Sequence, residues 1–130
     1  MCVFSHIEIG ISNKSTIIMD AAKKVQEVNR ILKESGKDNN EFTEAFMKFM
    51  DATMEKGALD TKTKELIALG LSIASRCGWC ISYHVNQAIK AGATRKELME
   101  AGYVTVLMYG SQALMEMNDL LDAINQFEIK

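Results

Sequence analysis

Residues 65–84 read ELIALGLSIASRCGWCISYH, so that an apolar helical segment and a group of reactive side chains follow one another directly. The first half, residues 65–75, places apolar side chains on nearly every side of a helix. Cys77 and Cys80 stand three positions apart, and His84 follows four positions later. In a helix these spacings bring the three side chains onto one face. The sequence therefore predicts an apolar helix followed by a second helix with a thiol pair and a base on one side.

Helical signals extend on both sides of this segment, and the chain contains no proline to interrupt them. Side chains that cap helix N-termini and glycines that end helices recur along the sequence. The predicted helices run from Asp20 to Ser35-Gly36, from Asn40 to Gly57, from Asp60 or Thr61 to Ser75, from Cys77 to Ala91-Gly92, from the capping box Thr94-Arg95-Lys96-Glu97 to Gly110, and through Leu114 to Ile124. We predict an all-α bundle of about six helices, with residues 20–130 forming a single domain.

Residues 1–19 carry weaker signals than the rest of the chain. Within them, His6-Ile7-Glu8-Ile9 alternates in the manner of a short strand, and the same residues are equally compatible with an extended arm. We assign residues 1–19 as an N-terminal arm or short extension. Cys2 lies near its free end and is expected to take no part in the chemistry.

The composition excludes several classes of protein. Hydrophobic residues make up 48% of the chain and charged residues 25%, with a formal net charge of −2, so nothing favours nucleic acid or an anionic membrane as a partner. No apolar run approaches the roughly 20 residues of a membrane span. Residues 1–19 lack the basic start and long apolar centre of a signal peptide. Because three cysteines are also too few for a secreted disulfide scaffold, we expect a cytoplasmic protein.

The predicted third and fifth helices are apolar on nearly all sides, and helices of that kind are usually buried. A chain of 130 residues has little interior in which to enclose two of them. We therefore expect the subunits to pack together as a homo-oligomer.

The thiol pair has the features of a dithiol redox site. A cysteine near a helix N-terminus is more readily ionised, because unpaired N–H groups and the helix dipole stabilise the thiolate. An unperturbed cysteine, with a pKa near ~8.5, is only slightly ionised at neutral pH. His84 is positioned to take the proton of Cys80, and Glu65 to orient that histidine or receive the proton onward. These four residues are the candidate catalytic groups.

Other interpretations of the same residues remain open. Cys77 and Cys80 could be ordinary core cysteines. The same pair could bind zinc together with His84 and Glu65, since all four are suitable ligand types, although structural zinc sites usually combine two such cysteine or histidine pairs. Glu65 taken alone is most simply a solvated or dipole-stabilising acid in a first helical turn. Trp79 could shield the thiols or form a wall for an apolar substrate.

The pattern Glu65-x11-Cys77-x2-Cys80-x3-His84 resembles the signature of the carboxymuconolactone decarboxylase superfamily, and more narrowly its alkylhydroperoxidase D (AhpD-like) branch. The continuation from Ala88 to Leu98 is also similar, and the resemblance covers roughly residues 41–125. It implies an all-helical fold that assembles as homotrimers or homohexamers. It also implies a peroxidase or disulfide reductase in which Cys77 and Cys80 cycle between dithiol and disulfide, with a proton relay through Glu65 and His84.

The resemblance further implies a class of substrate and partner. The substrate is a hydroperoxide or a protein disulfide, the reductant is a thiol, a peroxiredoxin or a lipoyl protein, and no bound cofactor is implied. AhpD proteins carry a further histidine just before the second cysteine, where this chain has Trp79, which implies a simpler relay. Family members that decarboxylate the muconolactone ring generally lack the cysteine pair. A lyase acting on small cyclic acids is therefore the competing hypothesis.

Overall fold

The computed structural model describes residues 18–127, and every regular element in that range is a helix. The helices are α1 (Ala21–Asp38), α2 (Asn40–Met54), α3 (Thr61–Ala74), α4 (Gly78–Lys90), α5 (Arg95–Tyr109) and α6 (Ser111–Gln126). This confirms the predicted all-α fold of about six helices. The strand or arm predicted at His6–Ile9, and Cys2, lie outside the described residues.

Three helix starts are formed by the capping residues that the sequence indicates. Asp20 accepts the backbone N–H of Lys23, and Asp60 accepts that of Thr63. At the start of α5, the Thr94 hydroxyl accepts the N–H of Glu97 while the Glu97 carboxylate accepts the N–H of Thr94. This reciprocal pair satisfies two backbone donors that would otherwise lack a partner.

Other predicted boundaries are wrong by a few residues. The first helix does not stop at Ser35-Gly36 but continues to Asp38. The second helix is capped by Asn39 rather than Asn40, because the Asn39 side chain accepts the N–H of Phe42. It ends at Met54, before the predicted Gly57. Helix termini depend on small local energies, so errors of this size are expected.

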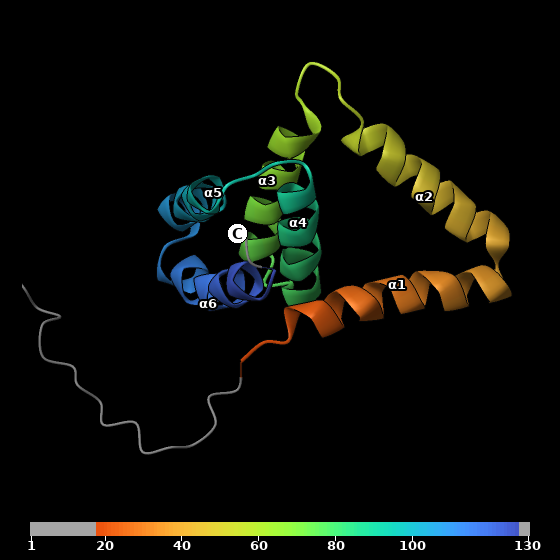
Figure 1. Cartoon of the computed structure of the whole chain (residues 1–130), viewed down its shortest axis with the longest axis horizontal. Helices are drawn as coiled ribbons and strands as arrows, with labels where there is room; N and C mark the ends of the chain where they lie inside the picture. The colour runs from red at the N-terminus through yellow and green to blue at the C-terminus, as the bar shows by residue number, and fades with distance from the viewer. Residues whose placement is uncertain (1–17, 128–130) are drawn as a thin grey trace, which may run out of the picture.

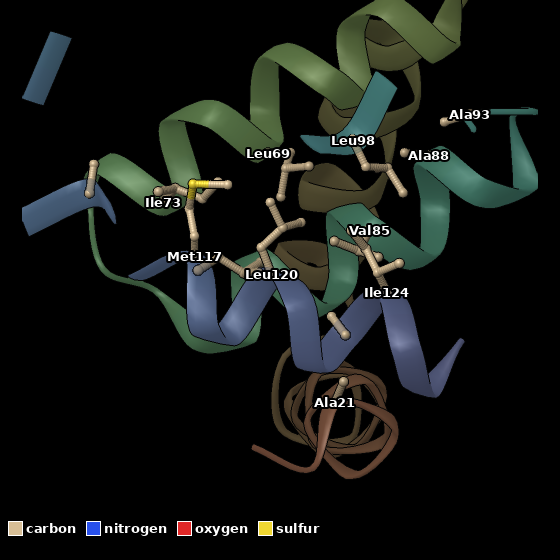
Figure 2. Close-up of a cluster of buried hydrophobic side chains, with 13 residues drawn as sticks. Ala21, Leu69, Ile73, Val85, Ala88, Ala93, Leu98, Met117, Leu120 and Ile124 are labelled. Atoms are coloured by element: carbon tan, nitrogen blue, oxygen red, sulfur yellow. The ribbon is translucent and has the colours of Figure 1, made fainter. Parts of the chain in front are cut away.

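The core lies among α3, α4, α5 and α6, with the start of α1 against one end (Figure 2). Apart from Met117, its members are small or branched apolar side chains, and all are almost fully removed from solvent. They are Ala21, Leu69, Ile73, Ile81, Val85, Ala88, Ala93, Leu98, Ala113, Met117, Leu120, Ala123 and Ile124. The packing of α3 against α4 in this core fixes the position of the face of α4 that carries Cys80 and His84.

Helices α1 and α2 extend away from the other four helices (Figure 1). No residue of α2 is buried. Even its large aromatic side chains, Phe42, Phe46 and Phe49, are exposed to solvent. Among residues 18–127, no helix is long and apolar enough to cross a membrane.

Helices α3 and α5 are each buried on one face only. Their opposite faces are apolar and solvent-exposed: Leu71 of α3 is 64% exposed and Leu107 of α5 is 81% exposed. Neither helix is therefore enclosed on all sides within the single chain. Contiguous apolar surface of this kind is typical of protein interfaces, and self-association stays a prediction.

Candidate active site

A tight turn between α3 and α4 positions the two cysteines. The N–H of Cys77 donates to the carbonyl of Ser72, and the N–H of Arg76 donates to that of Ile73. This is the Schellman pattern that ends many helices, and it requires a left-handed residue just past the end. Arg76 takes that conformation with φ of 57°, although glycine is usual there. The turn makes Cys77 the residue that caps α4.

Cys77 and Cys80 are joined by a disulfide, with their Cα atoms 5.1 Å apart. The Cys77 sulfur also accepts the backbone N–H of Cys80, with a donor–acceptor distance of 3.2 Å. Both sulfurs therefore lie at the N-terminal turn of α4. Once the bond is reduced, unpaired backbone N–H groups and the helix dipole in that turn stabilise a thiolate.

Glu65 and His84 form a hydrogen-bonded pair across the α3–α4 contact. The Glu65 carboxylate lies 2.7 Å from Nδ1 of His84, and Glu65 is only 5% exposed. The interpretation of Glu65 as a solvated acid is thus wrong, because packing of α3 on α4 buries it. An ionised carboxylate only accepts hydrogen bonds, so Nδ1 carries the proton and Nε2 of a neutral His84 is the free acceptor. The pair has the form of a base and the group that orients it.

Cys80 and His84 lie one turn apart on α4 and share the wall of a groove of about 390 Å³. The other walls come from α1 and α2 and are almost entirely apolar. They consist of Val28, Ile31, Leu32, Phe46, Phe49, Met50, Thr53 and Met54. Cys77 does not line this groove. A substrate bound there would reach the Cys80 end of the disulfide first.

The same two residues also border a second, more open cavity of about 580 Å³. Its walls come from the end of α3, with Ser72 and Ser75, and from Tyr109 at the end of α5. Two cavities therefore give access to Cys80 and His84, one lined by α1 and α2 and the other by the end of α3.

Tyr83 also lines the groove, and sequence reasoning gave it no role. Its ring packs edge-on against that of His84, with ring centres 5.2 Å apart. Burial raises the pKa of the Tyr83 hydroxyl, and the negative charges of Glu65 and Asp51 raise it further. The hydroxyl therefore stays neutral at physiological pH.

Trp79, between the two cysteines, is held by two residues of α1 that sequence reasoning missed. Its indole N–H donates to the Glu27 carboxylate at 2.7 Å, and the Lys24 ammonium lies 3.9 Å from the ring centre. No local signal could have revealed these contacts, because Glu27 and Trp79 are 52 positions apart in the sequence.

The four residues of the alternative zinc interpretation do not form a metal cluster in this structure. Across residues 18–127, no three histidine, cysteine, aspartate or glutamate side chains lie close enough to hold one ion. The two cysteine sulfurs are bonded to each other.

Comparison with known proteins gives consistent matches. The sequence profile of the carboxymuconolactone decarboxylase family matches residues 40–123. A crystal structure of a member from Legionella pneumophila is 34% identical with a TM-score of 0.78, covering 82% of this chain and 96% of that one. A second, from Thermotoga maritima, is 30% identical with a TM-score of 0.70, covering 79% and 88%. An involvement in the antioxidative response has been suggested for that protein.

Curated relatives carry no assigned activity. An uncharacterized protein of the cox locus of Paracoccus denitrificans is 32% identical over 97 residues, which is 75% of this chain and 87% of that protein. An uncharacterized protein of Cupriavidus necator is 31% identical over 109 residues, which is 82% and 96% of the two chains.

Proposed function

Because the chain belongs to the carboxymuconolactone decarboxylase family, we propose that it is an AhpD-like thiol peroxidase, a dithiol–disulfide oxidoreductase that reduces hydroperoxides. The observation that carries the proposal is the joint presence of a disulfide at the start of α4 and a buried Glu65–His84 pair one turn away. Dithiol chemistry needs a stabilised thiolate and a base to form it, and this arrangement supplies both.

In the oxidative half-reaction, Nε2 of His84 takes the proton of Cys80. The thiolate attacks the terminal oxygen of the hydroperoxide and the O–O bond breaks, so that Cys80 becomes a sulfenic acid. The alkoxide that leaves is protonated and departs as the alcohol. The thiol of Cys77 then displaces water from that sulfur and forms the disulfide. The two thiols supply both electrons, so one hydroperoxide yields one alcohol, one water and one disulfide.

In the reductive half-reaction, a thiol partner restores the dithiol. Its thiolate attacks one sulfur of the disulfide to give a mixed disulfide, and its second thiol resolves that intermediate. A protein with paired thiols, of the peroxiredoxin or lipoyl type, fits this chemistry. The protein disulfide of such a partner is also the alternative substrate, because the exchange is reversible.

The apolar walls of the groove favour a hydroperoxide with an apolar group. We further propose that the protein works in the cytoplasm as a homotrimer or homohexamer. The exposed apolar faces of α3 and α5 support the assembly, because they would be removed from water by a second copy.

The test is a thiol count of the reduced protein before and after a small excess of cumene hydroperoxide. We expect the loss of two thiols, a mass decrease of about 2 Da, and a bond mapped to Cys77 and Cys80. The Cys2→Ser variant should behave in the same way. The proposal is wrong if both thiols survive, as they would in a lyase or a zinc protein, or if the bond maps to Cys2.

A further inference from the structure

Trp79 occupies a constrained position between the cysteines. It is 50% exposed, yet its indole is fixed from two directions by α1, through Glu27 at its N–H and Lys24 over its face. A cation over an indole ring is held by the negative face of the ring, and this interaction persists at partly exposed sites. The ring therefore acts as a support that keeps the Lys24 ammonium near the cysteine pair.

Gly78 shows how closely charged groups approach the first turn of α4. A Cβ atom at this position would lie 3.4 Å from Cε of Lys24 and 3.1 Å from a carboxylate oxygen of Asp119. The glycine thus leaves room for both side chains beside the residue that separates Cys77 from Trp79. Lys24 and Asp119 reach this point from different helices, α1 and α6.

Titratable side chains approach the cysteine pair from four helices. Helix α1 contributes Lys24 and Glu27, α3 contributes Glu65, α4 contributes His84, and α6 contributes Asp119 and Glu116. The α3–α4 turn adds Arg76, whose guanidinium lies 3.9 Å from the Glu116 carboxylate. Carboxylates thus approach from three helices, and each of them disfavours a negative charge on either sulfur.

Lys24 acts against that negative surrounding. Burial raises the pKa of Asp119, the positive charge of Lys24 lowers it, and Asp122 raises it. Lys24 is therefore close enough to influence an acid that also lies beside Gly78. A thiolate formed at Cys77 or Cys80 lies at the same turn.

We propose that Lys24 is a positioning residue of the redox site: held across the Trp79 indole, its ammonium favours the thiolate form of the reduced cysteine pair. The inference rests on the proposed function only in requiring that the disulfide can be reduced.

The test is the pH dependence of alkylation of the reduced protein by iodoacetamide, measured separately for Cys77 and Cys80 by peptide mapping. Alkylation follows the thiolate fraction and needs no peroxide. Lys24→Met keeps the length of the side chain and removes its charge. We expect the midpoint of the alkylation profile to rise by about half to one pH unit. Below the midpoint, this corresponds to an alkylation rate about 3- to 10-fold lower.

Two control variants make the result specific. Lys24→Arg keeps the charge and the contact with the ring, so its profile should match that of the parent. Lys23→Met removes the same charge from the neighbouring exposed position of α1 and should also match. Circular dichroism of each variant checks that the fold is kept.

The inference is overturned if Lys24→Met alkylates like the parent, or if Lys23→Met shifts the midpoint equally, which would indicate a general effect of net charge. Its failure is separable from failure of the proposed function. If the parent protein does not react with hydroperoxide, but Lys24→Met still raises the midpoint of the alkylation profile, only the proposed peroxidase activity is refuted. A working peroxidase without the shift would refute only the role of Lys24.

Discussion

Replacing His84 by glutamine should slow oxidation of the dithiol more than replacing Glu65 by glutamine. Glutamine cannot act as a base near neutral pH, so His84→Gln removes general-base catalysis, which typically contributes about 10²–10⁴-fold. At about 1.36 kcal/mol per tenfold change in rate, the loss is about 2.7–5.4 kcal/mol of transition-state stabilisation. The alkylation profile of Cys80 should also move to higher pH.

Glu65→Gln leaves an amide oxygen that can still accept the Nδ1–H of His84, so the tautomer is kept and only the charge is lost. A hydrogen bond to a charged group contributes about 1.5–3 kcal/mol, against about 0.5–1.5 kcal/mol for a neutral one. The difference of about 1–1.5 kcal/mol predicts a rate about 5- to 12-fold lower. The distance of 2.7 Å and the burial of Glu65 place this bond in the range where the charge matters.

The assay is a single turnover in which reduced protein is mixed with cumene hydroperoxide, quenched with acid and analysed by intact mass. His6→Gln is a matched control, because the sequence contains two histidines and this variant removes the other one. The reasoning is refuted if His84→Gln oxidises at the parental rate, which would make the histidine purely structural. Equal effects of the two substitutions would instead show that Glu65 exchanges protons directly rather than orienting His84.

Three further outcomes follow from the structure. Leu69 is fully buried, so Leu69→Ala should lower the free energy of unfolding, measured in urea, by about 2–5 kcal/mol. Leu71 is 64% exposed, so the control Leu71→Ala should change the free energy of unfolding of the single chain by less than about 0.5 kcal/mol. Burial raises the folded-state pKa of Asp119 above its ordinary value of 3.8, so its ionisation costs stability as the pH rises through that value. Asp119→Asn should therefore raise the melting temperature at pH 7, and no gain should remain well below pH 3.8. Leu107→Asp places a charge on the exposed face of α5 and should shift sedimentation towards the monomer, whereas a parent protein that is already monomeric at micromolar concentration would exclude the proposed assembly.

Local sequence signals were sufficient for the helices and for the placement of Cys80 and His84 on one face of α4. The caps at Asp20, Asp60 and Thr94 act within three or four residues, so they can be recognised without tertiary structure. The same holds for Cys80 and His84, because one helical turn fixes their relative positions. Where competing local signals are nearly equal, as at Asn39 and Asn40, the predicted boundary was wrong by one residue.

Contacts between helices had to come from the tertiary structure. The packing of α3 on α4 buries Glu65 against His84. The local sequence is compatible with a solvated acid, and only this packing makes Glu65 the hydrogen-bond partner of His84. The approach of Lys24 and Glu27 to Trp79 depends on how α1 meets the start of α4. The groove beside Cys80 likewise needs α1, α2 and α4 together.

The sequence by itself thus determined which segments are helical, and which of their faces are apolar or reactive, because helix periodicity and capping are short-range properties. Only the tertiary structure decided which helix face packs against which other helix face. That choice depends on shape complementarity and burial among side chains distant in sequence, summed over the whole core. Packing between helices is what places three features beside the cysteine pair: the Glu65 carboxylate, the Lys24 ammonium and the apolar walls of α1 and α2.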